Sequence, residues 1–148
     1  MDFIQNGVLT MKIKTLVGLS LPLVCLASSL AYADFKSPSG NVVCSTSANL
    51  NPKGGVYCYV GTENPRPPLP KPRDCDFDWG GAFGVEKIGK TQMYCVSDYP
   101  FDPNPTILNY GQTIKGKTYE CTSRNTGMTC KNTSGHGFTL SKSSQIIF

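Results

Sequence analysis

The sequence contains one histidine, His136, and no two cysteines separated by two residues. A CxxC pair usually begins a zinc ribbon or a thioredoxin-type redox site, so neither is expected. A single histidine cannot supply the imidazole ligands of a typical catalytic zinc site, and no Gly-x-Ser-x-Gly motif positions a serine nucleophile. We therefore expect no catalytic residue, no metal and no cofactor, which favours a protein that is not an enzyme.

Charged residues are also few, at 16% of the chain, and basic residues never form a run of four or more. Removing Lys12, Lys14 and Asp2 from the 14 basic and 10 acidic residues leaves a net charge of +3 for residues 34–148. Nucleic-acid binding requires a concentrated basic patch. Nucleic acid is therefore not an expected partner.

Leu, Ile, Val and Phe are sparse after residue 33, and no amphipathic helical period of useful length occurs there. A domain of this size buries about two-thirds of its unfolded surface, which gives only a modest core. Such a core needs additional stabilisation.

One long apolar run does occur, from Thr15 to Leu30, between the basic residues Lys12 and Lys14 and the small-residue site 31–33. This order of a basic start, an apolar centre and a small-x-small site is typical of a secretory signal peptide. We predict a helical signal peptide over residues 1–33, cleaved after Ala33, and no membrane span in the mature protein. Met11 opens the pattern better than Met1, which indicates that residues 1–10 are an over-extended start.

Two alternatives to a cleaved signal peptide are weaker. An uncleaved anchor would need about 20 apolar residues, but Pro22 and several serines interrupt the run. A lipid-modified Cys25 would normally follow a small residue, and Val24 precedes it.

Loss of Cys25 leaves an even set of six cysteines, which in a small exported domain indicates a disulfide framework. The set is Cys44, Cys58, Cys75, Cys95, Cys121 and Cys130. Six cysteines allow many pairings, but hairpins bring sequence neighbours together. We therefore expect bridges Cys44–Cys58, Cys75–Cys95 and Cys121–Cys130.

Short β-prone segments recur about every dozen residues between Gly, Pro and Asn, which predicts one all-β domain over residues 34–148. Its expected form is a small disulfide-stapled antiparallel β-sandwich or barrel. The expected strands cover 42–44, 56–60, 83–88, 93–96, 113–122, 128–131, 138–140 and 146–148.

The segment from Pro65 to Pro72 has five prolines in eight residues and cannot join a central sheet, because proline lacks the amide donor. We expect a stiff strap over the surface. The alternative is a ligand for an SH3-type domain, since the PxxP spacing occurs.

The run Asp74-Cys75-Asp76-Phe77-Asp78-Trp79 combines three carboxylates, a cysteine and two aromatic residues in six positions. An EF-hand loop would need Gly and Glu where Trp79 and Val85 stand, so we expect a solvated acidic turn. The carboxylates could instead form a glycosidase pair, although nothing marks a buried acid. Trp79 is expected to plug the core; exposed, it could stack on a sugar or anchor a partner. Trp79, Asp76 and Asp78 are the weak ligand-binding candidates.

Two polar residues near the carboxyl end have ordinary explanations. His136 is expected to be a loop residue with a local hydrogen bond, because no triad partner is marked. Asn132-Thr133-Ser134 matches a glycosylation sequon, which we interpret as coincidental.

Several short motifs together resemble a family of small secreted bacterial proteins that carry a cysteine-rich domain of unknown function. They are SPSGN-x2-C at 37–44, DWG at 78–80, C-x-S-D at 95–98, L-x-YG at 108–111, GMTC-x-N at 127–132 and GHGF at 135–138. The resemblance implies export, a compact β-rich domain and paired cysteines. It implies no activity and no site residues.

The expected function is that of an exported, non-enzymatic binding module, secreted or periplasmic, for a ligand of the cell envelope or the exterior such as a glycan. One alternative is a periplasmic inhibitor or immunity protein against a hydrolase such as lysozyme, with the acidic loop 74–78 in a cationic cleft. The other is an undetected hydrolase that uses the run from Asp74 to Trp79.

Overall fold

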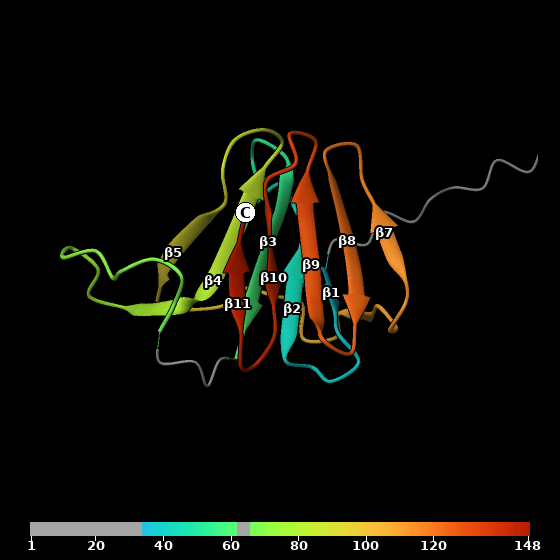
Figure 1. Cartoon of the computed structure of the whole chain (residues 1–148), viewed down its shortest axis with the longest axis horizontal. Coiled ribbons are helices and arrows are strands. Elements are labelled where there is room, and N and C mark those ends of the chain that lie inside the picture. Colours follow the sequence, from blue (N-terminus) through green and yellow to red (C-terminus); the bar gives the residue numbers. More distant parts are fainter. Residues whose placement is uncertain (1–33, 62–65) are drawn as a thin grey trace, which may run out of the picture.

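The computed structural model describes residues 34–61 and 66–148, and this part of the chain forms strands without helices (Figure 1). The strands are β1 (Asp34–Lys36), β2 (Val42–Ser45), β3 (Gly55–Val60), β4 (Asp78–Glu86), β5 (Gln92–Val96), β6 (Thr106–Ile107), β7 (Thr113–Lys115), β8 (Tyr119–Arg124), β9 (Gly127–Asn132), β10 (Gly137–Leu140) and β11 (Gln145–Ile147). The predicted signal peptide lies outside the described residues. Within them, no helix is long and apolar enough to cross a membrane.

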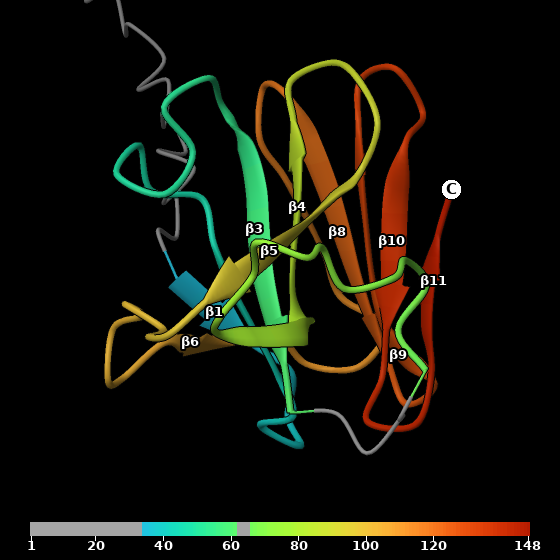
Figure 2. The same ribbon diagram turned by 90° about the vertical axis from the view of Figure 1, so that its left-hand side faces the viewer.

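Two sheets pack face to face and form a sandwich (Figures 1 and 2). One has the order β5-β4-β3-β2-β1-β6 and the other β11-β10-β9-β8-β7. All pairings are antiparallel except that of β1 with β6. The structure thus confirms the all-β fold and selects the sandwich over the barrel.

The strands form where β-branched and aromatic residues alternate across the sheet. In β3, Val56, Cys58 and Val60 face the core, while Tyr57 and Tyr59 face outward. In the core between the sheets, the buried ring of Phe83 on β4 packs against the buried ring of Phe138 on β10, with the two centroids 6.0 Å apart.

The strands β1 and β6 were not predicted, and two of the expected strands had wrong boundaries. β4 begins at Asp78 rather than at Phe83, because a register shift between Asp78 and Ala82 lets the strand continue through Gly80, whose φ is +105°. The single strand expected over 113–122 is two strands, β7 and β8. A turn at Gly116, where an added Cβ would lie 2.2 Å from the Tyr119 ring, separates them.

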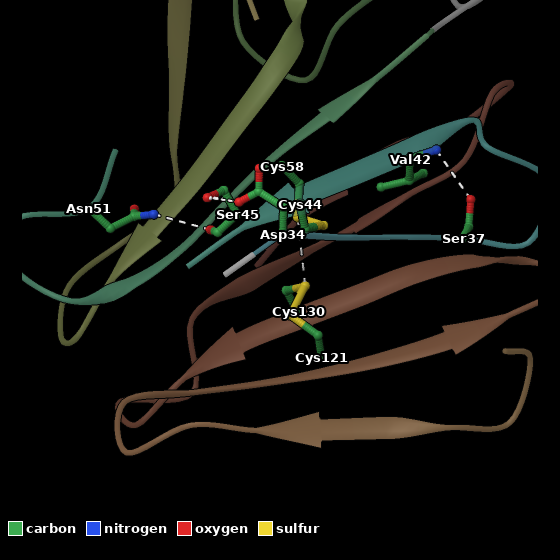
Figure 3. The surroundings of a disulfide bond; sticks show 9 residues. All are labelled: Asp34, Ser37, Val42, Cys44, Ser45, Asn51, Cys58, Cys121 and Cys130. Carbon is green, nitrogen blue, oxygen red and sulfur yellow. Dashed lines mark hydrogen bonds between the residues drawn. A yellow bond between two sulfur atoms is a disulfide. The ribbon is translucent and has the colours of Figure 1, made fainter. Parts of the chain in front are cut away.

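Two of the three disulfides lie in the core, one in each sheet (Figure 3). Cys44 and Cys58 are direct register partners on β2 and β3, with Cα atoms 4.0 Å apart. Cys121 and Cys130 have the same relation on β8 and β9, at 4.1 Å. All four residues are fully buried.

These two disulfides touch across the interface between the sheets. The Sγ atoms of Cys58 and Cys130 are 3.8 Å apart, which is a van der Waals contact because both sulfurs are oxidised (Figure 3). Cys75 and Cys95 form the third bridge, with Cα atoms 5.7 Å apart. The pairing of sequence neighbours is confirmed for all six cysteines.

Polar bonds join the sheets at the end of the sandwich where β4 turns into β5 and β9 turns into β10. Asn132 is buried, and its amide nitrogen donates to the carbonyl oxygens of Glu86 (3.0 Å) and Gly89 (2.8 Å). The Thr133 hydroxyl donates to the carbonyl oxygen of Lys87 (2.7 Å), and the Thr91 hydroxyl donates to that of Gly137 (2.6 Å). We call these bonds the polar clamp.

Aromatic rings cover the outer face of the first sheet. Tyr57 lies 5.5 Å from Tyr94 and 5.9 Å from Phe101, centroid to centroid, and Tyr59 lies 3.5 Å from Tyr99. The loop 97–105 therefore packs on this face. The backbone N–H of Asp102 also holds this loop to β1, because it donates to the Asp34 carboxylate (2.6 Å).

Asn132→Ala is expected to lower the free energy of unfolding by about 2–3 kcal/mol, because it removes two donated bonds and leaves the carbonyl oxygens of Glu86 and Gly89 short of partners. Chemical denaturation measures this difference. Asn104→Ala, in the exposed loop 97–105, is the matched control and should change stability by less than about 0.5 kcal/mol. Equal losses of unfolding free energy in the two variants would contradict a stabilising role for the polar clamp.

Burial raises the pKa of Tyr57 to about 12, with smaller contributions from the charges of Tyr94 and Tyr59. The folded state favours the neutral phenol, so its stabilising contribution is complete below pH 10 and is lost as the pH rises toward 12. We expect Tyr57→Phe to reduce the alkaline decline of the unfolding free energy. The titration followed by absorbance at 295 nm should lose one tyrosine that ionises at high pH, near 12. Loss of a tyrosine that ionises near pH 10 would contradict this assignment.

Candidate ligand-binding surfaces

The residues between β3 and β4 form an arm that crosses one side of the sandwich. We define the arm as residues 66–77, which contain no strand. Figure 2 shows it passing from the side of β10 and β11 to the side of β4 and β5, and in Figure 1 it projects at the left. Its proline-rich part is the strap that the sequence predicts.

Three contacts hold the arm to the sandwich, and a fourth, between Lys71 and Phe77, lies within the arm itself. The Trp79 indole N–H donates to the carbonyl oxygen of Leu69 (3.0 Å), and the Lys71 ammonium donates to that of Phe77 (2.8 Å). The Cys75–Cys95 disulfide joins the arm to β5. Pro67 lies over Gly80, where an added Cβ would come within 3.3 Å of the proline ring.

The fixed arm leaves apolar surface in water. The side chain of Phe77 is 58% exposed and that of Leu69 is 38% exposed. Asp74, Asp76 and Asp78, which lie on either side of Phe77 in the sequence, are also exposed. The exposed ring of Phe77 is thus next in sequence to two exposed carboxylates, those of Asp76 and of Asp78, the first residue of β4, and Asp74 lies three residues before it.

Trp79 is half-buried and packs against the core, close to the expected plug. Its N–H bond to Leu69 attaches the arm, and its packing against the core leaves less ring surface for stacking than Phe77 exposes. The tryptophan is therefore a weaker ligand candidate than the neighbouring Phe77, which the sequence did not single out.

The aspartates do not assemble a metal site. Among the described residues, the group of three or more potential ligands that converge is Cys44, Cys58 and Cys130, whose sulfurs lie within 4.8 Å of one another. All three are in disulfides and offer no thiolate. The hydrolase alternative requires an enclosed acid, and Asp74, Asp76 and Asp78 are all exposed.

The two polar residues near the carboxyl end, Asn132 and His136, are bonded to each other in the turn between β9 and β10. The backbone N–H of His136 donates to Oδ1 of Asn132 (3.0 Å) within the turn between β9 and β10. The Asn132 nitrogen that a glycan would occupy already donates to two backbone carbonyl oxygens. Attaching a glycan to this nitrogen would therefore break hydrogen bonds that join the two sheets.

A groove of about 440 Å³ lies at the end of the sandwich opposite the polar clamp, where four loops meet. The loops are those between β1 and β2, β6 and β7, β8 and β9, and β10 and β11. The lining residues are Ser37, Ser39, Asn41, Val42, Tyr110, Arg124, Asn125, Thr126, Gly127, Met128, Leu140, Ser141, Lys142, Ser143 and Ser144. We call this the loop-end groove.

Sequence reasoning did not find the loop-end groove, because its residues come from segments about a hundred positions apart. The available signal was the shared composition of the turns, which are rich in serine and asparagine. A second, smaller cavity of about 300 Å³ lies at the open edge of the sandwich, between β6 and β7. Its lining is mixed: Phe35, Ile107, Leu108 and Ile114 are apolar, and Thr106, Gln112 and Thr113 are polar.

The chain belongs to a family of unknown function (DUF6636), whose profile matches residues 15–148. No curated protein matches the chain, and no solved structure does. The match agrees with the resemblance to a family that carries a domain of unknown function. It assigns no activity to either surface.

Proposed function

We propose that this protein is exported behind a cleaved signal peptide and that residues 34–148 act as a non-enzymatic binding module in the cell envelope or outside the cell. Three disulfides join all six cysteines of this region. Such bridges form and persist in oxidising compartments. This supports export to the periplasm or the exterior.

The arm is the observation on which the proposal rests. Exposed Phe77 places an apolar ring in water, and aromatic side chains of this kind often anchor protein interfaces. The arm is braced by a disulfide and by hydrogen bonds at Lys71 and Trp79. Because the arm is already ordered, a partner would lose little conformational entropy in fixing it.

The charges around Phe77 favour one class of partner. Asp74, Asp76 and Asp78 lie next to Phe77 in the sequence and complement a basic surface with an apolar pocket for the ring, although the same segment also carries the basic residues Arg66, Lys71 and Arg73. This arrangement supports the inhibitor or immunity alternative, in which the arm enters the cationic cleft of a hydrolase such as lysozyme. A carbohydrate partner gains less from three carboxylates.

Affinity capture from an envelope extract tests the proposal, with the full chain expressed for export and purified in its oxidised form. We expect one stoichiometric partner, and Phe77→Ala should weaken its binding at least about tenfold, since anchor residues contribute more than about 1.4 kcal/mol. Asp76→Asn and Asp78→Asn should slow association most at low salt.

Ile88→Ala is the matched control, because Ile88 is 67% exposed on the turn between β4 and β5, away from the arm. It should retain the partner at the affinity of the unaltered protein. Capture that Phe77→Ala leaves unchanged would contradict recognition by the arm.

A further inference from the structure

The loop-end groove has a lining that differs sharply from the surface of the arm. Its fifteen lining residues include six serine and threonine side chains, Tyr110, two asparagine side chains, Arg124 and Lys142, and no carboxylate. A groove with this lining favours an anion and offers many partners for hydroxyl groups. Its volume of about 440 Å³ is within the range of small-ligand sites.

The loops that carry these groups are internally bonded. The Ser37 hydroxyl accepts from the backbone N–H of Val42 (3.2 Å), and the Ser39 hydroxyl accepts from that of Asn41 (3.4 Å). On the facing sheet, the backbone N–H of Ser144 donates to the Ser141 hydroxyl (3.1 Å). The groove is therefore pre-formed on both sides, which reduces the entropy that a ligand must remove on binding.

Tyr110 and Arg124 are held near each other at the groove. The backbone N–H of Gly111, next to Tyr110, donates to the carbonyl oxygen of Ser123, next to Arg124 (2.8 Å). Tyr110 is 47% exposed, so part of its ring is open to a ligand. An aromatic face beside a guanidinium can contact an apolar ring face and a carboxylate of the same molecule.

We propose that the loop-end groove binds an acidic sugar, that is, a hydroxyl-rich ring that bears a carboxylate. Arg124 pairs with the carboxylate, because its planar guanidinium can donate two parallel hydrogen bonds to one carboxylate. Tyr110 contacts the ring face, and the side chains of Asn41, Asn125, Thr126 and Ser143 bond to the sugar hydroxyls, because the hydroxyls of Ser37, Ser39 and Ser141 already bond within their loops. Binding forms and breaks no covalent bond.

A short oligogalacturonate is the probe, and its methyl ester is the matched neutral ligand, with the same ring hydroxyls but no charge. Calorimetry on the exported, oxidised protein should show binding of the acid and binding at least about tenfold weaker for the ester. Amide chemical shifts should move in the loops 37–41, 125–126 and 141–144. Acetate and inorganic phosphate at equal concentration should not displace the probe.

Arg124→Gln should weaken binding of the acid at least about tenfold and leave binding of the ester unchanged. Arg124→Lys should keep part of the preference for the acid over the ester. Lys117→Gln is the charge-matched control, since Lys117 is exposed on the turn between β7 and β8, at the opposite end of the sandwich. It should bind as the unaltered protein does.

Four results would overturn the assignment: no binding of the acid, equal binding of the ester, displacement by simple anions, or no effect of Arg124→Gln. The groove is independent of the arm, so Phe77→Ala should bind the acid normally. Failure of one proposal therefore leaves the other standing.

Discussion

The contact between two disulfides across the sheet interface determines much of this structure. Cys44–Cys58 and Cys121–Cys130 each join directly opposed residues, so each fixes the register of its hairpin. A slip of one residue would turn the sulfurs to the outer face. Because the Sγ atoms of Cys58 and Cys130 meet at 3.8 Å, the same bridges also form part of the core of a domain with few large aliphatic residues.

A fixed register places every loop at a defined end of the sandwich. One end is closed by the polar clamp around Asn132, where backbone carbonyl oxygens of one sheet bond to side chains of the other. The opposite end remains open as the loop-end groove. The third disulfide, Cys75–Cys95, braces the arm along one side. Both candidate binding surfaces are thus loops on a rigid scaffold, the usual location of recognition sites.

The sequence predicted the features that depend on local pattern. An even cysteine set and hairpin geometry predicted the disulfides, and the prolines of residues 65–72 predicted a strap. It did not predict the start of β4 at Asp78, because a bulge at Gly80 depends on pairing with β5. It also missed the exposure of Phe77, which follows from how Trp79 and Cys75 anchor the arm. The loop-end groove depends on stacking of the two sheets, which no local pattern records.

The most direct test compares urea unfolding of the oxidised protein with that of the same protein refolded after full reduction, with six free thiols confirmed by titration. Each disulfide should contribute about 2–4 kcal/mol, chiefly by restricting the unfolded chain. Three such contributions rival the net stability of about 5–15 kcal/mol of an ordinary domain. The reduced protein should therefore be largely unfolded without urea. An unchanged unfolding midpoint after reduction would contradict the claim that the paired sulfurs hold the sandwich together.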